Sequence, residues 1–324
     1  MRYIFGRILH AVLLLFAVSL LTFLFSSLTP GNYFDEMRLN PQISAETLAA
    51  LRSQYQLDRP LPVRYVHWLG GVVRGKLGFS FAFNTPVGPL LWTRAKNTLL
   101  LTLTATLLAW LIGLPLGVWS AAKRGRAPDR ALSWATATLL AVPDLVLALA
   151  LLIFAVRTGW FPTGGLVSIG FDDFSVLQKL RDLALHLTLP VIAHVLSALP
   201  TIIRHVRASV VEALEAPFLR AARAHGLPQR TLLFRYALRA ASNPLISLFG
   251  FSLGTLLSGS LLVEVVMSWP GLGPLLLESI LARDLYVVIG SVLLSTVFLV
   301  LGNLLADLLL YVTDPRIRSG ERAR

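Results

Sequence analysis

The sequence has 324 residues, of which 55% are hydrophobic and 14% are charged, with 29 Lys and Arg against 17 Asp and Glu. Long apolar segments and few charges are typical of an integral membrane protein and argue against a basic nucleic-acid-binding domain. The chain contains no cysteine, which excludes disulfides, thiolate catalysis and cysteine-based metal sites.

The first apolar segment runs from Ile8 to Leu28, directly after Arg2 and Arg7. It is as long as a membrane span and longer than the apolar core of a signal peptide. Because no small-residue cleavage site follows it, we expect residues 1–29 to form an uncleaved transmembrane helix that starts in the cytoplasm.

The next region, residues 30–95, is too polar to span a bilayer, and we interpret it as an extracytoplasmic region. Within it, the spacing of Tyr65, Trp68 and Leu69 predicts a short helix from Arg64 to Val73.

A glycine-rich string in the same region imitates a nucleotide site. Gly70, Gly75 and Lys76 stand at the spacing of a P-loop, but Leu77 takes the place of the Ser or Thr that holds magnesium. We therefore expect that this chain has no ATPase site of its own.

Five further apolar segments lie in residues 96–313, and each is long enough to cross a bilayer. They are Asn97–Ala121, Ala131–Val156, Leu183–Ile203, Leu245–Met267 and Tyr286–Val312. Gly113 and Pro115 interrupt the first of them, which we interpret as a packing kink rather than a moving hinge.

The distribution of Lys and Arg sets the expected orientation. They are in excess at the N-terminus, near 123–130, in 204–244 and in the tail 314–324, while the other short connections are balanced. The positive-inside rule places the rich segments in the cytoplasm. We therefore predict an all-α integral membrane protein with six transmembrane helices, cytoplasmic N- and C-termini and a cytoplasmic tail at 314–324.

The connection at 204–244 has its own helical pattern. Gly226, Leu227 and Pro228 form a helix stop, and a second helical pattern begins at Leu232. Before the stop, five apolar residues recur every fourth position, which predicts one face of a single helix. They are Val206, Val210, Leu214, Phe218 and Ala222. Residue chemistry alone leaves two interpretations open, a helix that docks on a partner and a helix that lies on anionic lipid.

Three motifs carry a resemblance to a known family. The string from Arg220 to Gly226 resembles the EAA loop of ABC-importer permeases: Ala221, Ala222 and Gly226 match, while Arg220 replaces the Glu. Ser268–Gly273 and Asp314–Arg318 are similar to strings of the dipeptide, oligopeptide and nickel branch of that family.

The resemblance departs from the pattern further along the loop. The later Ile-x-Leu-Pro of the family falls on Tyr236, Leu238 and Arg239, where only the Leu remains. The resemblance nevertheless extends over almost the whole chain, because its three motifs are well separated and in the right order.

The resemblance implies a type I ABC-importer permease in the bacterial cytoplasmic (inner) membrane, with a five-helix core in 96–313 and a coupling loop at 204–244. Its implied partners are a second permease subunit, identical or distinct, two ATP-binding subunits and an extracytoplasmic solute-binding protein. The implied cargo is a peptide or a related small solute such as a nickel complex. No cofactor, metal or nucleic acid is implied. The residues implied to contact the ATP-binding subunit are Arg220, Ala221, Ala222, Ala224, Gly226 and Leu227.

Polar side chains are rare within the apolar segments. Asp144 is the candidate for the translocation path, because an ionisable group at membrane depth is a functional candidate by default. His194, Glu264, Asn303 and Asp307 have plainer interpretations as helix contacts or interface residues. The alternative function is an ion-coupled secondary transporter, which predicts a paired intramembrane carboxylate and inverted repeats.

Overall fold

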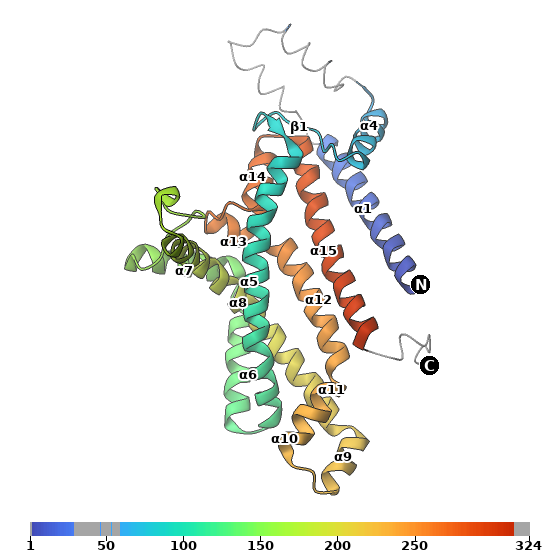
Figure 1. Ribbon diagram of the computed structural model, residues 1–324, viewed down its shortest axis with the longest axis vertical. Coiled ribbons are helices and arrows are strands. Elements are labelled where there is room, and N and C mark those ends of the chain that lie inside the picture. Colours follow the sequence, from blue (N-terminus) through green and yellow to red (C-terminus); the bar gives the residue numbers. More distant parts are fainter. Residues whose placement is uncertain (1, 29–45, 47–52, 54–58, 314–324) are drawn as a thin grey trace. The chain divides into compact units, whose positions relative to one another are not determined.

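The computed structural model describes residues 2–28, 46, 53 and 59–313, and Figure 1 shows that these residues form helices joined by short loops. The predicted all-α class is confirmed, apart from one hairpin of two-residue strands. Most of the predicted extracytoplasmic region between 29 and 58, and the tail 314–324 with its Asp314–Arg318 motif, lie outside the described residues.

The chain divides into two compact units. The first comprises Met1–Thr98 and Pro270–Phe298, and the second comprises Leu99–Trp269 and Leu299–Arg324. Two of the three boundaries fall inside long helices, since α5 (Val87–Ala122) and α15 (Leu285–Thr313) each contribute to both units.

The first unit is built around aromatic side chains. Helix α1 (Arg2–Leu28) contributes Phe23, and α4 (Leu61–Val73) contributes Tyr65 and Trp68 to one buried cluster. The Tyr65 hydroxyl also forms a 2.9 Å hydrogen bond with the Ser19 hydroxyl. The short helix predicted from Arg64 to Val73 is therefore confirmed, and its buried aromatic face holds it against the first helix.

A small hairpin connects α4 to α5. Strands β1 (Phe79–Ser80) and β2 (Thr85–Pro86) pair antiparallel. Asp284, between α14 (Leu272–Leu281) and α15, accepts hydrogen bonds from the Ser80 hydroxyl at 2.7 Å and the Ala82 amide at 3.0 Å. One carboxylate thus holds the hairpin. The glycine string imitating a P-loop begins inside α4, so its first glycine is helical and does not follow a strand.

The core of the second unit lies between α5 and α8 (Val176–Glu215). A Cβ atom on Gly113 would lie 2.7 Å from the Ile202 side chain, and one on Gly117 would lie 2.6 Å from Val206. Helix α5 continues through Pro115. The interruption at Gly113 and Pro115 is therefore a place of close helix packing, in agreement with the interpretation as a packing kink.

The long helices extend beyond a bilayer. Helix α8 has 40 residues and is about 60 Å long, roughly twice the hydrocarbon thickness. Its polar end, beyond Ile203, must lie outside the membrane. Four described helices are long and apolar enough to span: Gly6–Ser26 within α1, and α5, α8 and α15.

The apolar segment predicted as a span over 131–156 consists of two helices. The chain forms α6 (Ala127–Leu140) and α7 (Asp144–Thr158), which are bent by 93° and together would make a fifth span. Pro143 is extended (φ −61°, ψ 145°), and its ring disfavours a helical conformation at the preceding Val142.

The fifth apolar segment, predicted over 245–267, also consists of two helices. They are α12 (Ser242–Gly259) and α13 (Leu261–Val266), which meet at Ser260. The predicted total of six spans therefore stays a prediction. The remaining elements are the 3-10 turn η1 (Phe171–Asp173), α9 (Pro217–Ala224), α10 (Gln229–Thr231), the π-helix η2 (Leu232–Ala237) and α11 (Leu238–Ala240).

Glycines bring α12 and α15 into backbone contact within the second unit. A Cβ atom on Gly250 would lie only 2.0 Å from the Ala306 Cβ, and one on Gly302 would lie 2.9 Å from the Gly254 amide nitrogen. Small residues at such spacing let membrane helices approach closely, where packing replaces the missing hydrophobic effect.

Replacing Gly250 by Val should lower the thermal unfolding midpoint of the purified protein in detergent, with a loss of about 1–3 kcal/mol from overpacking. The matched control is Gly259→Val on the same helix, where an added Cβ meets no atom within 4 Å. Equal midpoints for the two variants would show that the close contact does not contribute to stability.

Candidate functional site

The helix predicted from Val206 through Ala222 is interrupted, which corrects the single-stripe interpretation. Helix α8 ends at Glu215, Ala216 is extended with ψ 143°, and α9 starts at Pro217. The proline ring disfavours a helical Ala216, so the chain changes direction there.

The break also changes which side chains face inward. Val206 and Val210 are buried as predicted, but Phe218 is 55% exposed and its neighbour Leu219 is 1% exposed. Leu219 joins the core cluster of the second unit. The predicted apolar stripe is therefore correct along α8. After Pro217 the buried position is shifted by one residue, from Phe218 to Leu219.

The end of α9 has the predicted geometry. Gly226 adopts a left-handed conformation (φ 81°), and its amide donates to the Arg223 carbonyl at 3.0 Å. The Leu227 amide donates to the Ala222 carbonyl at 3.3 Å, which completes a Schellman motif. The Leu227 side chain packs against the same core cluster as Leu219.

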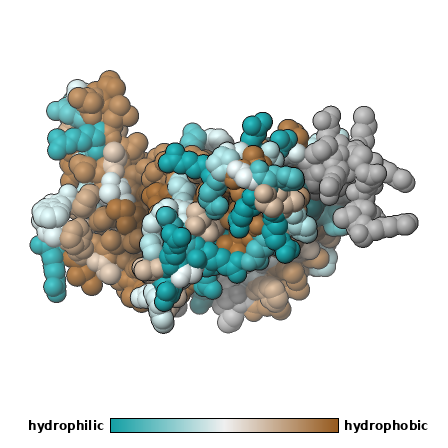
Figure 2. All heavy atoms as spheres, turned by 90° about the horizontal axis from the view of Figure 1, so that it is seen from below, coloured by the Kyte–Doolittle hydropathy of each residue, from teal (hydrophilic) through white to brown (hydrophobic). Residues whose placement is uncertain are grey.

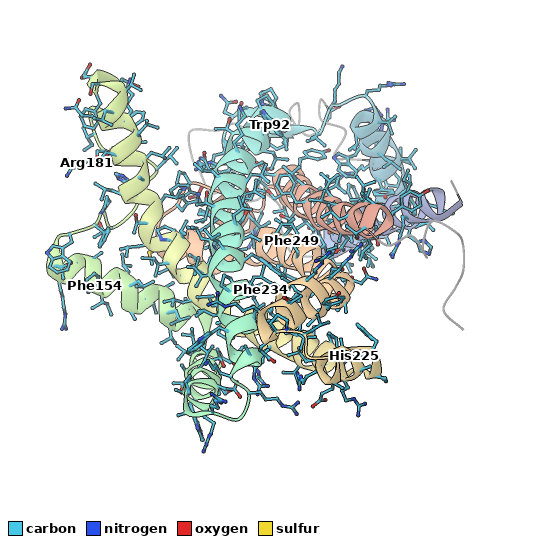
Figure 3. The ribbon with its side chains drawn as sticks, turned by 60° about the horizontal axis from the view of Figure 1, so that its bottom comes forward. Trp92, Phe154, Arg181, His225, Phe234 and Phe249 are labelled. Carbon is cyan, nitrogen blue, oxygen red and sulfur yellow. The ribbon has the colours of Figure 1, made fainter. Side chains whose placement is uncertain are left out.

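The outer face of α9 is open. Four of the six predicted contact residues, Arg220, Ala221, Ala224 and Gly226, are exposed, while Ala222 and Leu227 are half-buried. Phe218, which the sequence pattern assigned to the core, also lies on the accessible surface. Figure 3 shows His225, which follows α9, at the outer end of this helix. Figure 2 shows hydrophilic side chains gathered on the end that carries α9 and α10.

The second helical pattern is confirmed with a different internal geometry. From Gln229 to Ala240 the chain is helical, but residues Leu232–Ala237 form a π-helix. Leu232, Leu233 and Ala237 are buried, which seats this segment on the core. No residue type in the sequence signals the wider π turn.

An ion pair anchors the C-terminal part of α8 to the α5–α6 connection. Asp129 is 3% exposed and accepts bonds from Arg207 Nε at 2.6 Å and from a terminal Arg207 nitrogen at 2.8 Å. The Ser120 hydroxyl and the Gly125 amide donate to the same carboxylate at 2.6 and 2.8 Å. Exposed Arg124 and Glu215 form a second, outer pair. No sequence pattern marked Asp129 as a functional residue, although it follows Pro128 next to a run of basic residues.

The surroundings of Asp129 keep it ionised. Hydrogen bonds from Arg207, stronger than the opposing effect of burial and supplemented by those from Ser120 and Gly125, hold the pKa of the Asp129 carboxyl well below its usual range. Because this folded-state pKa is depressed, the pair contributes its stability above the ordinary carboxyl pKa of about 4 and loses it as the pH falls further.

The candidate path residue Asp144 lies at the bend between α6 and α7. It is exposed in the isolated chain, and its Oδ1 accepts a 2.6 Å hydrogen bond from the Ser197 hydroxyl of α8. His194, one turn before Ser197, is buried, and its Nε2 has no hydrogen-bond partner within the described part of the chain. Glu264 is fully buried and accepts a 3.0 Å bond from the Ser260 hydroxyl.

Comparison with protein families finds two matches. The family described as "Binding-protein-dependent transport system inner membrane component" matches residues 113–319. A family describing the N-terminal part of such membrane components matches residues 1–102.

Several relatives align over nearly their full length. The oligopeptide transport system permease protein AppB of Bacillus subtilis is 34% identical over 317 residues, 97% of this chain and 98% of the relative. A putative peptide permease protein of Brucella ovis is 36% identical over 322 residues, 98% of this chain and 99% of the relative. The glutathione transport system permease protein GsiC of Salmonella typhimurium is 34% identical over 321 residues, again 98% and 99%.

A solved structure shares the fold. An inward-facing structure of the MetNI methionine ABC transporter superposes with a TM-score of 0.56 at 21% identity, covering 69% of this chain and 96% of that chain. At this identity the likeness concerns the fold, which is that of a type I importer permease.

Replacing Arg207 by Gln should cost about 3 kcal/mol of stability, because it leaves the buried Asp129 carboxylate without its cation. Thermal unfolding followed by tryptophan fluorescence measures the loss. The control is Arg124→Gln, whose exposed pair with Glu215 should contribute less than about 1 kcal/mol. Equal losses for the two variants would contradict the anchoring role of Asp129.

Proposed function

This chain belongs to the binding-protein-dependent transport system inner membrane components, the permease subunits of ABC importers, and we propose that it moves peptides across the cytoplasmic membrane. The observation that carries this proposal is the alignment, over 97–98% of the chain, with relatives named for the transport of oligopeptides and peptides. The alternative cargo is a related small solute such as a nickel complex.

In this proposal the chain itself hydrolyses nothing. ATP is hydrolysed on two separate ATP-binding subunits, and α9 is the surface against which such a subunit docks. The exposed small residues Ala221, Ala224 and Gly226 permit close approach, and exposed Phe218 offers an aromatic anchor of the kind that dominates protein interfaces. The burial of Leu219 and the packing of Leu227 support this role, because a docking element transmits motion only when it is fixed to the bundle.

The proposed topology has six spans with both termini in the cytoplasm and the segment 204–244 on the same side. The excess of Lys and Arg near 123–130 and in 204–244 supports it. The bent pair α6–α7 and the pair α12–α13 would supply the third and fifth spans. The residues before α5 would then be extracytoplasmic, and their length and position make them the proposed contact for a solute-binding protein.

The surroundings of Asp144 support a second permease subunit as a partner. Its carboxylate, hydrogen-bonded by Ser197, is exposed beside a broken backbone in a span that is otherwise apolar. A charged group and a helix break cannot face lipid, and they are tolerated only against protein or a water-filled cavity. We therefore place Asp144 on the translocation path, between this chain and its partner permease.

Import should be driven by ATP and by no ion gradient. Liposomes containing the assembled transporter and supplied with its binding protein should accumulate radiolabelled oligopeptide when ATP and magnesium reach the ATP-binding subunits. Ionophores that dissipate proton and sodium gradients should leave the initial rate unchanged. Uptake that follows an imposed ion gradient in the absence of ATP would indicate a secondary transporter instead.

Gly226 offers a test of the docking element. Gly226→Val should uncouple ATP hydrolysis from import, because a β-branched residue at φ 81° costs about 1–2 kcal/mol and loosens the end of α9. Gly226→Asn is the matched control, since Asn tolerates the left-handed region and should retain coupling. The measurement is the ratio of peptide imported to ATP hydrolysed in the same vesicles. An unchanged ratio in Gly226→Val would count against the proposed role of α9.

A further inference from the structure

A groove between α6 and α8 is used by none of the roles described above. It has a volume of about 560 Å³, and its polar lining consists of Ser133, Thr136, Thr201, Arg204, His205 and Arg207. Exposed Ala137, Leu140 and Ala208 complete its walls. Within the described residues, no acidic side chain lines it.

The charge of the groove comes from Arg204. Arg207 is neutralised by its two bonds to Asp129. Arg204 is exposed and has neither an ion-pair nor a hydrogen-bond partner among the residues that the structure describes. His205 uses Nδ1 on its own helix, at 2.9 Å from the Thr201 carbonyl, which leaves Nε2 available. The groove therefore presents one unneutralised guanidinium together with hydroxyl groups, which is the chemistry that binds a carboxylate or phosphate.

The groove continues a polar line along α8. Ser197, Thr201 and Arg204 lie at positions i, i+4 and i+7 and thus share one helix face, while Ile202 and Ile203 are buried on the other side. Ser197 is the residue that holds Asp144. The line therefore has the carboxylate held by Ser197 at one end and the cation of Arg204 at the other. The helix positions 197 and 204 are separated along the axis by about 10 Å at 1.5 Å per residue.

We propose that the groove receives the C-terminal carboxylate of the imported peptide, with Arg204 as its cation, on the inner part of the translocation path. This inference rests on the proposed function. A peptide carries a positive amino terminus and a negative carboxyl terminus, and three extended residues reach about 10 Å. The line from Asp144 to Arg204 matches both signs and this length. The Asp144 end also disfavours an anionic lipid as the occupant.

The natural absence of cysteine makes a direct test possible. Ala137→Cys places one thiol in the groove of the assembled transporter in nanodiscs, and Ala208→Cys is a second variant on the opposite wall. Each thiol should react faster with an anionic methanethiosulfonate than with a cationic one. The ratio of these two rates should be about tenfold higher than the same ratio for a free thiol, because one nearby cation attracts the anionic reagent and repels the cationic one. Adding Arg204→Gln should abolish this preference. Arg130→Gln, an equal change of charge on α6 outside the groove, should preserve it.

The occupant is tested by protection of the same thiol. Trialanine should slow the reaction, and its C-terminal amide should not. Protection by inorganic phosphate alone, or by none of these solutes, would overturn the assignment of a peptide carboxylate. A preference that survives Arg204→Gln, or a thiol that neither reagent reaches, would overturn the anion site itself. If the unsubstituted transporter showed no ATP-driven oligopeptide uptake while the introduced thiol kept its charge preference, the proposed function would be contradicted instead.

Discussion

The bidentate contact between Arg207 and Asp129 fixes the C-terminal part of α8 to the start of α6. It joins the end of a helix about 60 Å long to the turn between α5 and α6, where Ser120 and Gly125 direct two further donors at the same carboxylate. An ion pair with so many hydrogen bonds is specific in direction as well as strong, because a shifted helix would leave a buried charge unsatisfied. The last part of α8, which leads into α9, begins directly after this contact.

Proline has two different effects in this fold. Pro115, Pro190 and Pro200 lie inside continuous helices, and the latter two are buried against neighbouring helices. Pro143 and Pro217 instead follow the breaks that create the bend at Asp144 and the start of α9. The difference lies in the packing around each residue, since buried neighbours can compensate a lost hydrogen bond within a helix. Both functional candidates, the path residue and the docking helix, lie directly after a proline that does break its helix.

Local patterns predicted the elements better than they predicted their connections. Apolar length gave the long helices, and the Gly226–Pro228 signal gave the end of α9, because both depend on neighbouring residues alone. The stripe through Phe218 was wrong and the bend inside the third apolar segment was not predicted, since neither pattern tells a proline that continues a helix from one that ends it. Asp129 could not be recognised, because its partner Arg207 is distant in sequence and only the fold brings the two together. The groove at Arg204 depends on the same long-range arrangement of α6 and α8.

The mounting of α9 has a mechanical consequence. Leu219, near the start of α9, is buried in one hydrophobic cluster, and Leu227, just past its end, packs against the same cluster. The short helix is therefore fixed to the core at two points. A force applied to α9 between these two contacts cannot rotate the helix about the extended residue Ala216. The force is instead transmitted to both α8 and the π-helical segment η2. These two segments would have to tilt together as one rigid body.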